Sequence, residues 1–276
     1  MVESPAPNPP PRRMRTGLWL FPSGSARELV DAVVAAEEGG FDEVWIADEG
    51  VMREPLVVLS AASQRTTRIR LGIGITTPAL RHPGALGSSI ATLDELSDGR
   101  ALLGLGVGGA LTLDPLGIDV ERPVRMMRDA IRVARAVIAR EAAEGYAPPT
   151  HAMPARQVPI FVASRGEQIN RLASRDADGV FLSGIALDRI SETIRWAHSV
   201  RPVDLALFPS ARFRDADPAD SPDAAALAGS PGHVAELLID LAAQHVPTTI
   251  GLCLVDGDEL STMVRRAVET IERFRR

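Results

Sequence analysis

Apolar runs alternate with segments of helical periodicity along almost the whole chain. Short, continuous apolar runs predict buried strands at residues 17–21, 43–47, 69–75, 101–106, 158–163, 179–183, 203–208 and 249–254. Apolar residues at helical spacing predict helices at residues 26–38, 55–64, 83–96, 123–144, 167–174, 187–200, 231–245 and 259–274. Continuous apolar strands are typical of a parallel sheet covered on both faces. Eight strands, each followed by a helix, therefore predict an α/β fold, a (β/α)8 TIM barrel forming a single domain over residues 15–276.

Residues typical of helix ends lie at the predicted boundaries. Ser25 is followed three residues later by Glu28, which is the spacing of a capping box. Pro123 and Pro231 suit the first turn of a helix, where the missing N–H costs nothing. Residues 209–232 are rich in Asp, Ala, Ser and Pro and predict a long loop after the seventh strand.

The charge composition excludes several kinds of chemistry. The formal net charge is −6 at pH 7, and all 30 basic residues are arginine. Without lysine the chain has no P-loop lysine, no Schiff-base lysine and no Ser-Lys pair. The arginines are scattered and form no basic block, which argues against a nucleic-acid partner. A small-molecule substrate is the expected partner.

Cysteine content and apolar run length bear on the cellular setting. Cys253 is the single cysteine, so no intrachain disulfide forms, and we expect a reducing, cytoplasmic location. No apolar run is long enough to span a membrane, so we expect no membrane association. Residues 1–14 are rich in proline and lack the apolar core of a signal peptide. We expect them to form a disordered tail.

Residues 104–109 match the pattern G-x-G-x-x-G after a predicted strand. In dinucleotide-binding folds this pattern opens directly into a helix whose N-terminus meets the pyrophosphate. Pro115 argues against a helix here, and we reject that interpretation. The glycines, Gly106 among them, are better explained by the close approach of a ligand or of other backbone.

Barrel enzymes place their chemistry at the C-terminal ends of the strands. Residues 72–78, Gly-Ile-Gly-Ile-Thr-Thr-Pro, lie there after the third strand; they leave room for a planar ring or form an ordinary strand exit. Asp48 and Glu49 follow the second strand. Adjacent residues in extended backbone point opposite ways, so we expect one carboxylate to face the pocket. The alternatives are a helix cap or a partner for an arginine such as Arg53.

The ends of the fifth and sixth strands carry residues suited to an anion. Ser164, Arg165 and Gly166 offer a hydroxyl, a guanidinium and backbone N–H groups at a helix start, which fits a phosphate; capping by Ser164 is the alternative. Ser183 and Gly184 could serve a phosphate or a ribitol chain in the same way.

The remaining candidate residues are a histidine and the cysteine. His82 lies near the expected mouth and either donates to a ligand or caps the helix that begins at Pro83. No two histidines have the spacing of metal ligands, and we expect no metal. Cys253 lies inside an apolar strand and is expected to be a buried, inert thiol.

Several of these stretches resemble the bacterial luciferase-like superfamily of flavin- and deazaflavin-dependent oxidoreductases. They are residues 35–48, 68–83, 91–100 with the following glycines, 159–166 and 177–180. Residues 114–119 and 128–131 are similar to the methylenetetrahydromethanopterin reductase branch, whose cofactor is coenzyme F420. The resemblance covers about residues 16–185 well and is mostly architectural beyond them.

The resemblance implies a deazaflavin or flavin ring at the C-terminal mouth, backed by a non-prolyl cis peptide after the third strand. Carried over, that bond is Gly74–Ile75, flanked by Thr76 and Thr77. Asp48 is implied to contact the polar edge of the ring. Ser164, Arg165, Gly166, Ser183 and Gly184 are implied to hold the phosphate-bearing tail. The family commonly forms dimers, so a homodimer is expected.

The chain also departs from the family pattern. Relatives often have histidine where this chain has Glu49. The reductase branch has carboxylates where Trp19 and Gly109 stand here. The loop after the seventh strand is short beside the usual family insertion.

Three hypotheses follow. The first is an F420-dependent oxidoreductase that transfers a hydride between the deazaflavin and a small organic substrate, with Glu49 as proton donor or acceptor and His82 as second candidate. The second is a reduced-FMN-dependent monooxygenase. The third is a non-catalytic cofactor-binding paralogue, motivated by the missing carboxylates.

Overall fold

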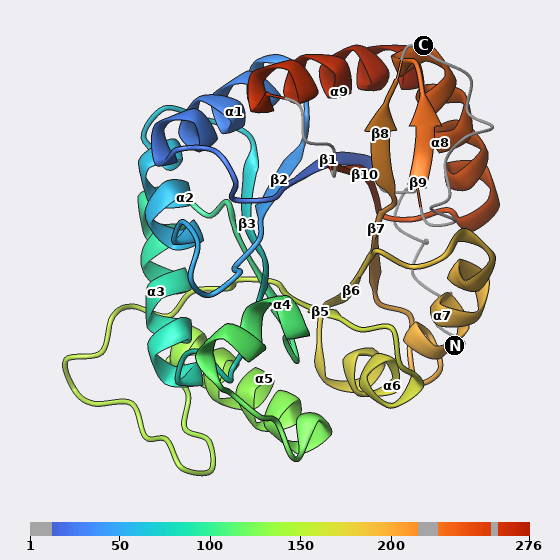
Figure 1. Cartoon of the computed structure of the whole chain (residues 1–276). Helices are drawn as coiled ribbons and strands as arrows, with labels where there is room; N and C mark the ends of the chain where they lie inside the picture. Colours follow the sequence, from blue (N-terminus) through green and yellow to red (C-terminus); the bar gives the residue numbers. More distant parts are fainter. Residues whose placement is uncertain (1–12, 215–225, 255–258) are drawn as a thin grey trace, which may run out of the picture.

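Eight parallel strands close into a barrel in the computed structural model, which describes residues 13–214, 226–254 and 259–276. Within these residues the barrel strands are β1 (Arg15–Leu20), β2 (Glu43–Ile46), β3 (Arg70–Thr76), β4 (Ala101–Gly106), β5 (Ile160–Ala163), β6 (Gly179–Ser183), β7 (Asp204–Phe208) and β10 (Thr249–Leu254). Strands β1 to β7 pair in chain order, and β10 closes the ring by pairing with both β7 and β1. The predicted TIM barrel is confirmed (Figure 1).

Helices surround the barrel on its outer side (Figure 1). The long ones are α1 (Ala26–Glu38), α2 (Pro55–Ser63), α3 (Pro83–Leu96), α5 (Pro123–Ala139), α6 (Glu167–Asp176), α7 (Ile190–Ala197), α8 (Pro231–His245) and α9 (Leu260–Phe274). The capping box at the start of α1 is present: Ser25 accepts from the backbone N–H of Glu28, whose carboxylate accepts from the N–H of Ser25. Local end signals therefore place α1, α3 and α8 where the periodicity predicts them.

Two predicted helices are too long. The one expected at residues 187–200 begins as a 3-10 turn over Leu187–Arg189 and ends with α7 at Ala197. The helix expected at residues 123–144 ends at Ala139, and Arg140 adopts a left-handed conformation with φ 56°. The N–H of Glu141 then donates back to the carbonyl of Ala136 at 2.8 Å, the pattern of a Schellman motif. Residues 141–144 have good helix propensity, but the chain must turn here to reach β5, and tertiary structure overrides propensity.

The loop predicted at residues 209–232 is wrong in part, because it contains two further strands. They are β8 (Ser210–Phe213) and β9 (Ala226–Gly229); β8 pairs with β10 and with β9. Each has four residues, too few for periodicity to detect, and each depends on a partner that is distant in sequence. Residues 215–225 lie outside the described residues.

A short helix was also missed. One turn, α4 (Ala110–Leu113), begins directly after Gly109 and continues as a 3-10 turn over Asp114–Leu116. The argument from Pro115 against a helix was wrong, because Pro115 lies in the first turn of the 3-10 segment, where its missing N–H is not needed. The glycine pattern nevertheless does not form a dinucleotide-binding turn, since Gly104 and Gly106 lie inside barrel strand β4.

The predicted tail, residues 1–14, lies outside the described residues except for its last two. Arg13 lies 3.7 Å from the Asp42 carboxylate, and Met14 packs against the hydrophobic core. The boundary between tail and barrel stays a prediction.

The inside of the barrel is filled by aromatic rings opposite glycines. Trp45 lies with its ring centre 5.4 Å from that of Phe161 and 4.9 Å from that of Phe181. A Cβ on Gly72 would lie 2.3 Å from the Trp45 ring, so glycine is required there. Large side chains on some strands therefore occupy the space that glycines leave on their neighbours.

A buried carboxylate joins four strands at the end where the strands begin. Glu43 is fully buried and accepts from Arg15 Nε at 2.6 Å and Arg70 at 2.8 Å. It also accepts from Trp45 Nε1 at 3.1 Å and Thr249 Oγ1 at 3.0 Å. Burial lowers the pKa of the Arg70 guanidinium, and the charge of Glu43 opposes that effect. The network ties β1, β3 and β10 to β2.

We expect Glu43→Gln to lower the free energy of unfolding by about 3 kcal/mol, because it leaves buried guanidinium charge without its carboxylate. Urea denaturation followed by circular dichroism measures this. The control is Glu141→Gln, an exposed site where a change within about 0.5 kcal/mol is expected. Equal stability of the two variants would show that the Glu43 network contributes little.

Candidate functional site

The candidate site lies at the mouth of the barrel, where the strands end. The loops after β2, β3 and β4 form one side of it, and those after β5 and β6 form the other. Parallel strands bring these loops to the same end of the barrel, so residues far apart in sequence meet there.

Strand β3 is irregular at the predicted position. Its register with β4 shifts between Ile73 and Thr76, and the Gly74–Ile75 peptide bond is cis. We call residues 74 and 75 the β3 bulge. The Ile75 side chain turns toward β4, where a Cβ on Gly106 would lie 2.4 Å from its Cδ1 atom. Gly106 therefore makes room for Ile75, and its contact with a ligand stays a prediction.

Hydrogen bonds from two other strands hold the β3 bulge. The Trp19 indole N–H donates to the Gly74 carbonyl, and the Asp48 backbone N–H donates to the Ile75 carbonyl at 3.3 Å. In addition, Thr76 Oγ1 donates to the Asp48 carboxylate at 2.6 Å. The bulge is thus fixed from β1 and from the end of β2.

Arg81 and Thr77 hold the loop that leaves β3. The Arg81 guanidinium lies 3.5 Å from the buried Asp48 carboxylate and donates to Glu54 at 2.7 Å. Thr77 Oγ1 donates to the carbonyl of Val107 after β4 at 2.8 Å. The loops after β2, β3 and β4 are therefore joined by side-chain contacts.

The two adjacent carboxylates turn to different partners. Asp48 is only 6% exposed and faces Thr76. Glu49 is half-buried and accepts from Thr112 Oγ1 of α4 at 2.7 Å. Of the two, Glu49 has the greater access to solvent.

His82 is exposed and forms the N-cap of α3. Its Nδ1 atom accepts from the backbone N–H of Gly84 at 3.1 Å. The capping alternative is thereby confirmed, and a catalytic role for His82 stays a prediction.

The residues predicted to hold an anion come together at the ends of β5 and β6. Ser164 Oγ accepts from the Gly166 N–H at 3.0 Å. Helix α6 starts after Gly166 without a side-chain cap, which leaves first-turn N–H groups for a ligand. The Arg165 guanidinium would lie 3.0 Å from a Cβ on Gly184, whose φ is 59°. The two loops therefore converge, with half-buried Ser183 beside them.

These residues fit the phosphate of a flavin or deazaflavin. A guanidinium, a hydroxyl and free helix N–H groups are the donors that a phosphate takes. We call Ser164, Arg165, Gly166, Ser183 and Gly184 the anion cradle. Position 184 favours glycine, because its φ of 59° lies in the left-handed region that other side chains rarely adopt. Asn170 supports the loop: its amide donates to the carbonyls of Ser164 and Gly166.

Four residues of the site were missed from the sequence: Trp19, Arg81, Thr112 and Asn170. Trp19 lies inside an apolar run that looks like core, and the available signal was that the reductase branch has a carboxylate at its position. Thr112 lies in the helix that was missed. Arg81 stands next to His82, and its position after the third strand was the available signal. Asn170 is polar within a helix interior, which is an unfavourable place unless its amide has a local role.

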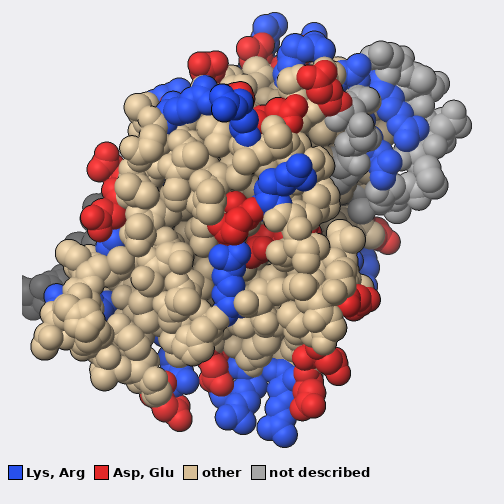
Figure 2. Space-filling view, turned by 60° about the vertical axis from the view of Figure 1, so that its left-hand side comes forward, with Lys and Arg blue, Asp and Glu red and all other residues tan. Residues whose placement is uncertain are grey.

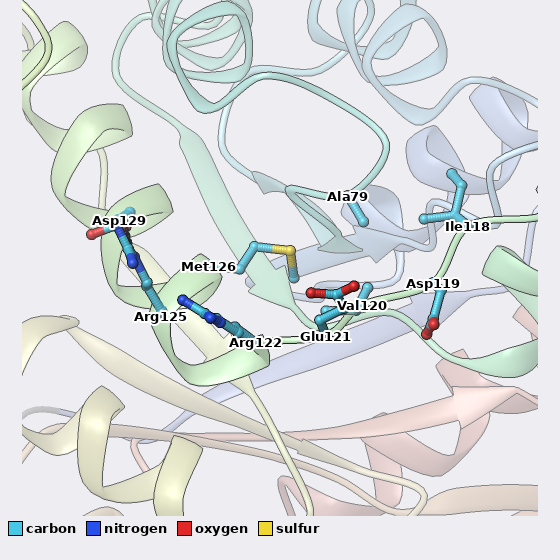
Figure 3. Close-up of a pocket in the computed structure, with 9 residues that line it drawn as sticks. All are labelled: Ala79, Ile118, Asp119, Val120, Glu121, Arg122, Arg125, Met126 and Asp129. Carbon is cyan, nitrogen blue, oxygen red and sulfur yellow. Dashed lines mark ion pairs between the residues drawn. The ribbon is translucent and has the colours of Figure 1, made fainter.

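A separate cavity of about 370 Å³ lies between the loop after β3 and the start of α5. It is lined by Ala79, Ile118, Asp119, Val120, Glu121, Arg122, Arg125, Met126 and Asp129. Figure 3 shows Arg122 and Arg125 side by side at one end and Met126 beneath Ala79. The predicted site residues do not line it, and its rim carries charges of both signs.

Cys253 is buried, and burial raises the pKa of its thiol to about 12. It therefore stays protonated at neutral pH and is a poor nucleophile. Among the described residues no group of His, Cys, Asp and Glu could hold a metal ion. Nor does any helix in the described part of the chain have the length and apolar character to cross a membrane.

Residues 10–201 match the family model described as luciferase-like monooxygenase. The chain belongs to this family. The luciferase-like chain is 32% identical over 266 residues to a 5,10-methylenetetrahydromethanopterin reductase of Methanolobus tindarius, covering 89% of this chain and 80% of the relative.

Two further proteins resemble this chain, one in sequence and one in fold. An F420-dependent glucose-6-phosphate dehydrogenase of Kineococcus radiotolerans is 33% identical over 187 residues, covering 60% of this luciferase-like chain and 56% of the relative. The crystal structure of monooxygenase RslO1 from Streptomyces bottropensis superposes with a TM-score of 0.79 at 20% identity, covering 94% of this chain and 98% of that one. This last likeness establishes the fold alone.

Proposed function

We propose that this chain is an F420-dependent oxidoreductase that transfers a hydride between the deazaflavin and a small organic substrate. The main support for the proposal is that two features lie at the same mouth of the barrel. They are the β3 bulge, which the Trp19 indole holds, and the anion cradle. The relative named as an F420-dependent glucose-6-phosphate dehydrogenase supports the choice of cofactor. When bound, F420 supplies the ring carbon that gives or takes the hydride.

Residues on the two sides of the mouth would have different roles. Ile75 would back the ring, while the buried Thr76 and Thr77 would support it from behind through their bonds to Asp48 and to the Val107 carbonyl. Asp48 would be the acceptor near the polar edge of the ring. Arg165, Ser164, Gly166, Ser183 and Gly184 would hold the phosphate-bearing tail. The protein's contribution is to hold the ring and the substrate carbon in contact and to keep water away.

Glu49 is the proposed proton donor or acceptor for the substrate. It is half-buried at the mouth, and Thr112 orients it with one hydrogen bond. Asp48 is less suited, because it is buried and already accepts from Thr76. His82 is the weaker candidate, since its Nδ1 atom caps α3.

A reduced-FMN monooxygenase is the second candidate function. The matching family model is described as luciferase-like monooxygenase, which favours it. FMN also carries a phosphate, so the same cradle at Arg165 and Gly184 suits either cofactor. Binding measurements separate the two.

We also infer that the chain forms a homodimer in the cytoplasm. The outward positions of α2 and α3 carry no charge over most of their length, and Figure 2 shows a broad face with few charged side chains. The exposed residues of these two helices are Val57, Ala61, Ala85, Ser88, Ser89, Thr92, Glu95 and Leu96, of which Glu95 alone is charged. A single, buried thiol suits a reducing compartment.

The wild-type chain is expected to bind F420 more tightly than FMN in a fluorescence titration. Arg165→Gln is expected to weaken F420 binding about tenfold, the loss of one charged hydrogen bond. Arg175→Gln is the control, because Arg175 is exposed at the far end of α6 and pairs with Asp176. A wild-type chain that binds neither cofactor would refute both candidate functions, and tighter binding of FMN would favour the second.

Glu49→Gln is expected to lower turnover about 100-fold while leaving the Kd for F420 unchanged, because the amide keeps the bond to Thr112 but carries no exchangeable acid. Steady-state assays over a panel of alcohols, aldehydes and methylene pterins would measure it. Glu121→Gln, exposed at the separate cavity, is the control. Unchanged turnover removes Glu49 from the mechanism. If the wild type binds F420 yet turns over no substrate, the non-catalytic hypothesis is favoured.

Light scattering is expected to give twice the chain mass of 29.5 kDa. Val57→Glu should shift the mass toward the monomer, because Val57 is 66% exposed on α2 and a charge there cannot be buried in an apolar contact. Val200→Glu, exposed elsewhere on the surface, should leave the mass unchanged. A monomeric wild type would contradict the proposed dimer.

A further inference from the structure

Trp19 stands on the inner face of β1 at the mouth of the barrel. Leu18 and Leu20, on either side of it, are fully buried in the outer core between strands and helices. Trp19 points the other way, packs against the aromatic interior and is half-buried. Its ring centre lies 6.3 Å from that of Phe21, so two aromatic rings follow one another up this side of the mouth.

The Trp19 indole spans two strands. Strand β1 pairs with β2 and β10, and its backbone has no pairing with β3. The indole N–H nevertheless donates to the carbonyl of Gly74, 55 residues away on β3. A side chain thus joins two strands that the backbone ladder does not.

The acceptor of this bond lies where the ladder is broken. The β3–β4 register passes from Ile73 to Thr76 and leaves out the two residues of the β3 bulge. Their carbonyls take partners from elsewhere: Gly74 from Trp19, and Ile75 from the N–H of Asp48. Position 74 cannot carry a side chain that would help to hold the bulge, because a Cβ there would lie 2.8 Å from Cβ of Trp45.

We propose that Trp19 is a positioning residue for the cofactor ring, acting through its N–H on the Gly74 carbonyl. The inference rests on the proposed function, because it concerns the bulge against which the ring would pack. With the N–H removed, Gly74 loses its partner and the bulge is held from the Asp48 side alone. Displacing a positioning group by about 1 Å is enough to weaken a tightly matched contact.

The opposing interpretation is that Trp19 only fills space. An isosteric residue without the N–H separates the two, because it keeps the ring volume. Position 19 is therefore replaced by 3-benzothienylalanine, in which sulfur stands in place of N–H, and in a second variant by phenylalanine. Trp196→Phe is the matched control, since Trp196 lies on α7 outside the barrel and is also half-buried.

The measurements are the Kd for F420, the absorption spectrum of bound F420, and the melting temperature. Both position-19 variants are expected to bind F420 about fivefold more weakly, the loss of one hydrogen bond of ordinary strength, and to shift the bound spectrum. Trp196→Phe should match the wild type in both. A merely structural role would lower the melting temperature and leave the bound spectrum unchanged.

The outcomes are distinguishable. If the benzothienyl variant binds F420 like the wild type with an unchanged spectrum, the inference is overturned and the proposed function stands. A defect in Trp19→Phe alone would assign the effect to ring volume and would also overturn it. If the wild type itself binds neither F420 nor FMN, the proposed function fails and the inference fails with it.

Discussion

Trp45 fills the centre of the barrel, and contacts at both ends of the barrel depend on this one side chain. Its N–H donates to Glu43, the carboxylate that gathers Arg15 and Arg70 where the strands begin. Its ring occupies the space in front of β3, so that Gly72 and Gly74 cannot carry side chains. Because protein interiors are close-packed, a large ring at this point fixes what its neighbours can be.

This packing explains why the mouth can hold an irregular strand. With Trp45 behind Gly74, the β3 bulge has a firm support on the inner side. Trp19 and Asp48 then hold its two carbonyls from β1 and β2. The anion cradle at β5 and β6 has a different origin, since it follows from a serine turn and an uncapped helix start. One site therefore combines a part fixed by core packing with a part fixed by local loop structure.

Local sequence patterns were sufficient for the elements that carry their own signals. The capping box at Ser25 and the prolines at 83 and 231 place their helices correctly, because these signals act within one turn. Local patterns failed where an element depends on a partner that is distant in sequence. The helix after Pro123 stops at Ala139 because the chain must turn toward β5, and β8 and β9 exist through pairing with β10 and with each other. The predicted anion residues also illustrate this division: their types could be read from the sequence, but the approach of Arg165 to Gly184 could not.

The amino-acid sequence predicted the barrel, the alternation of its strands and helices, and the strand ends at which chemistry is placed. It did so because hydrophobic periodicity and end signals are local, and because parallel strands bring their C-terminal ends to one face. Tertiary packing determined the partner of each candidate residue there. It turned Asp48 toward Thr76 and Glu49 toward Thr112 and made His82 a helix cap. It also joined Trp19 on β1 to Gly74 on β3. Those pairings depend on how distant segments pack around the Trp45 ring, and a local sequence pattern carries no information about that packing.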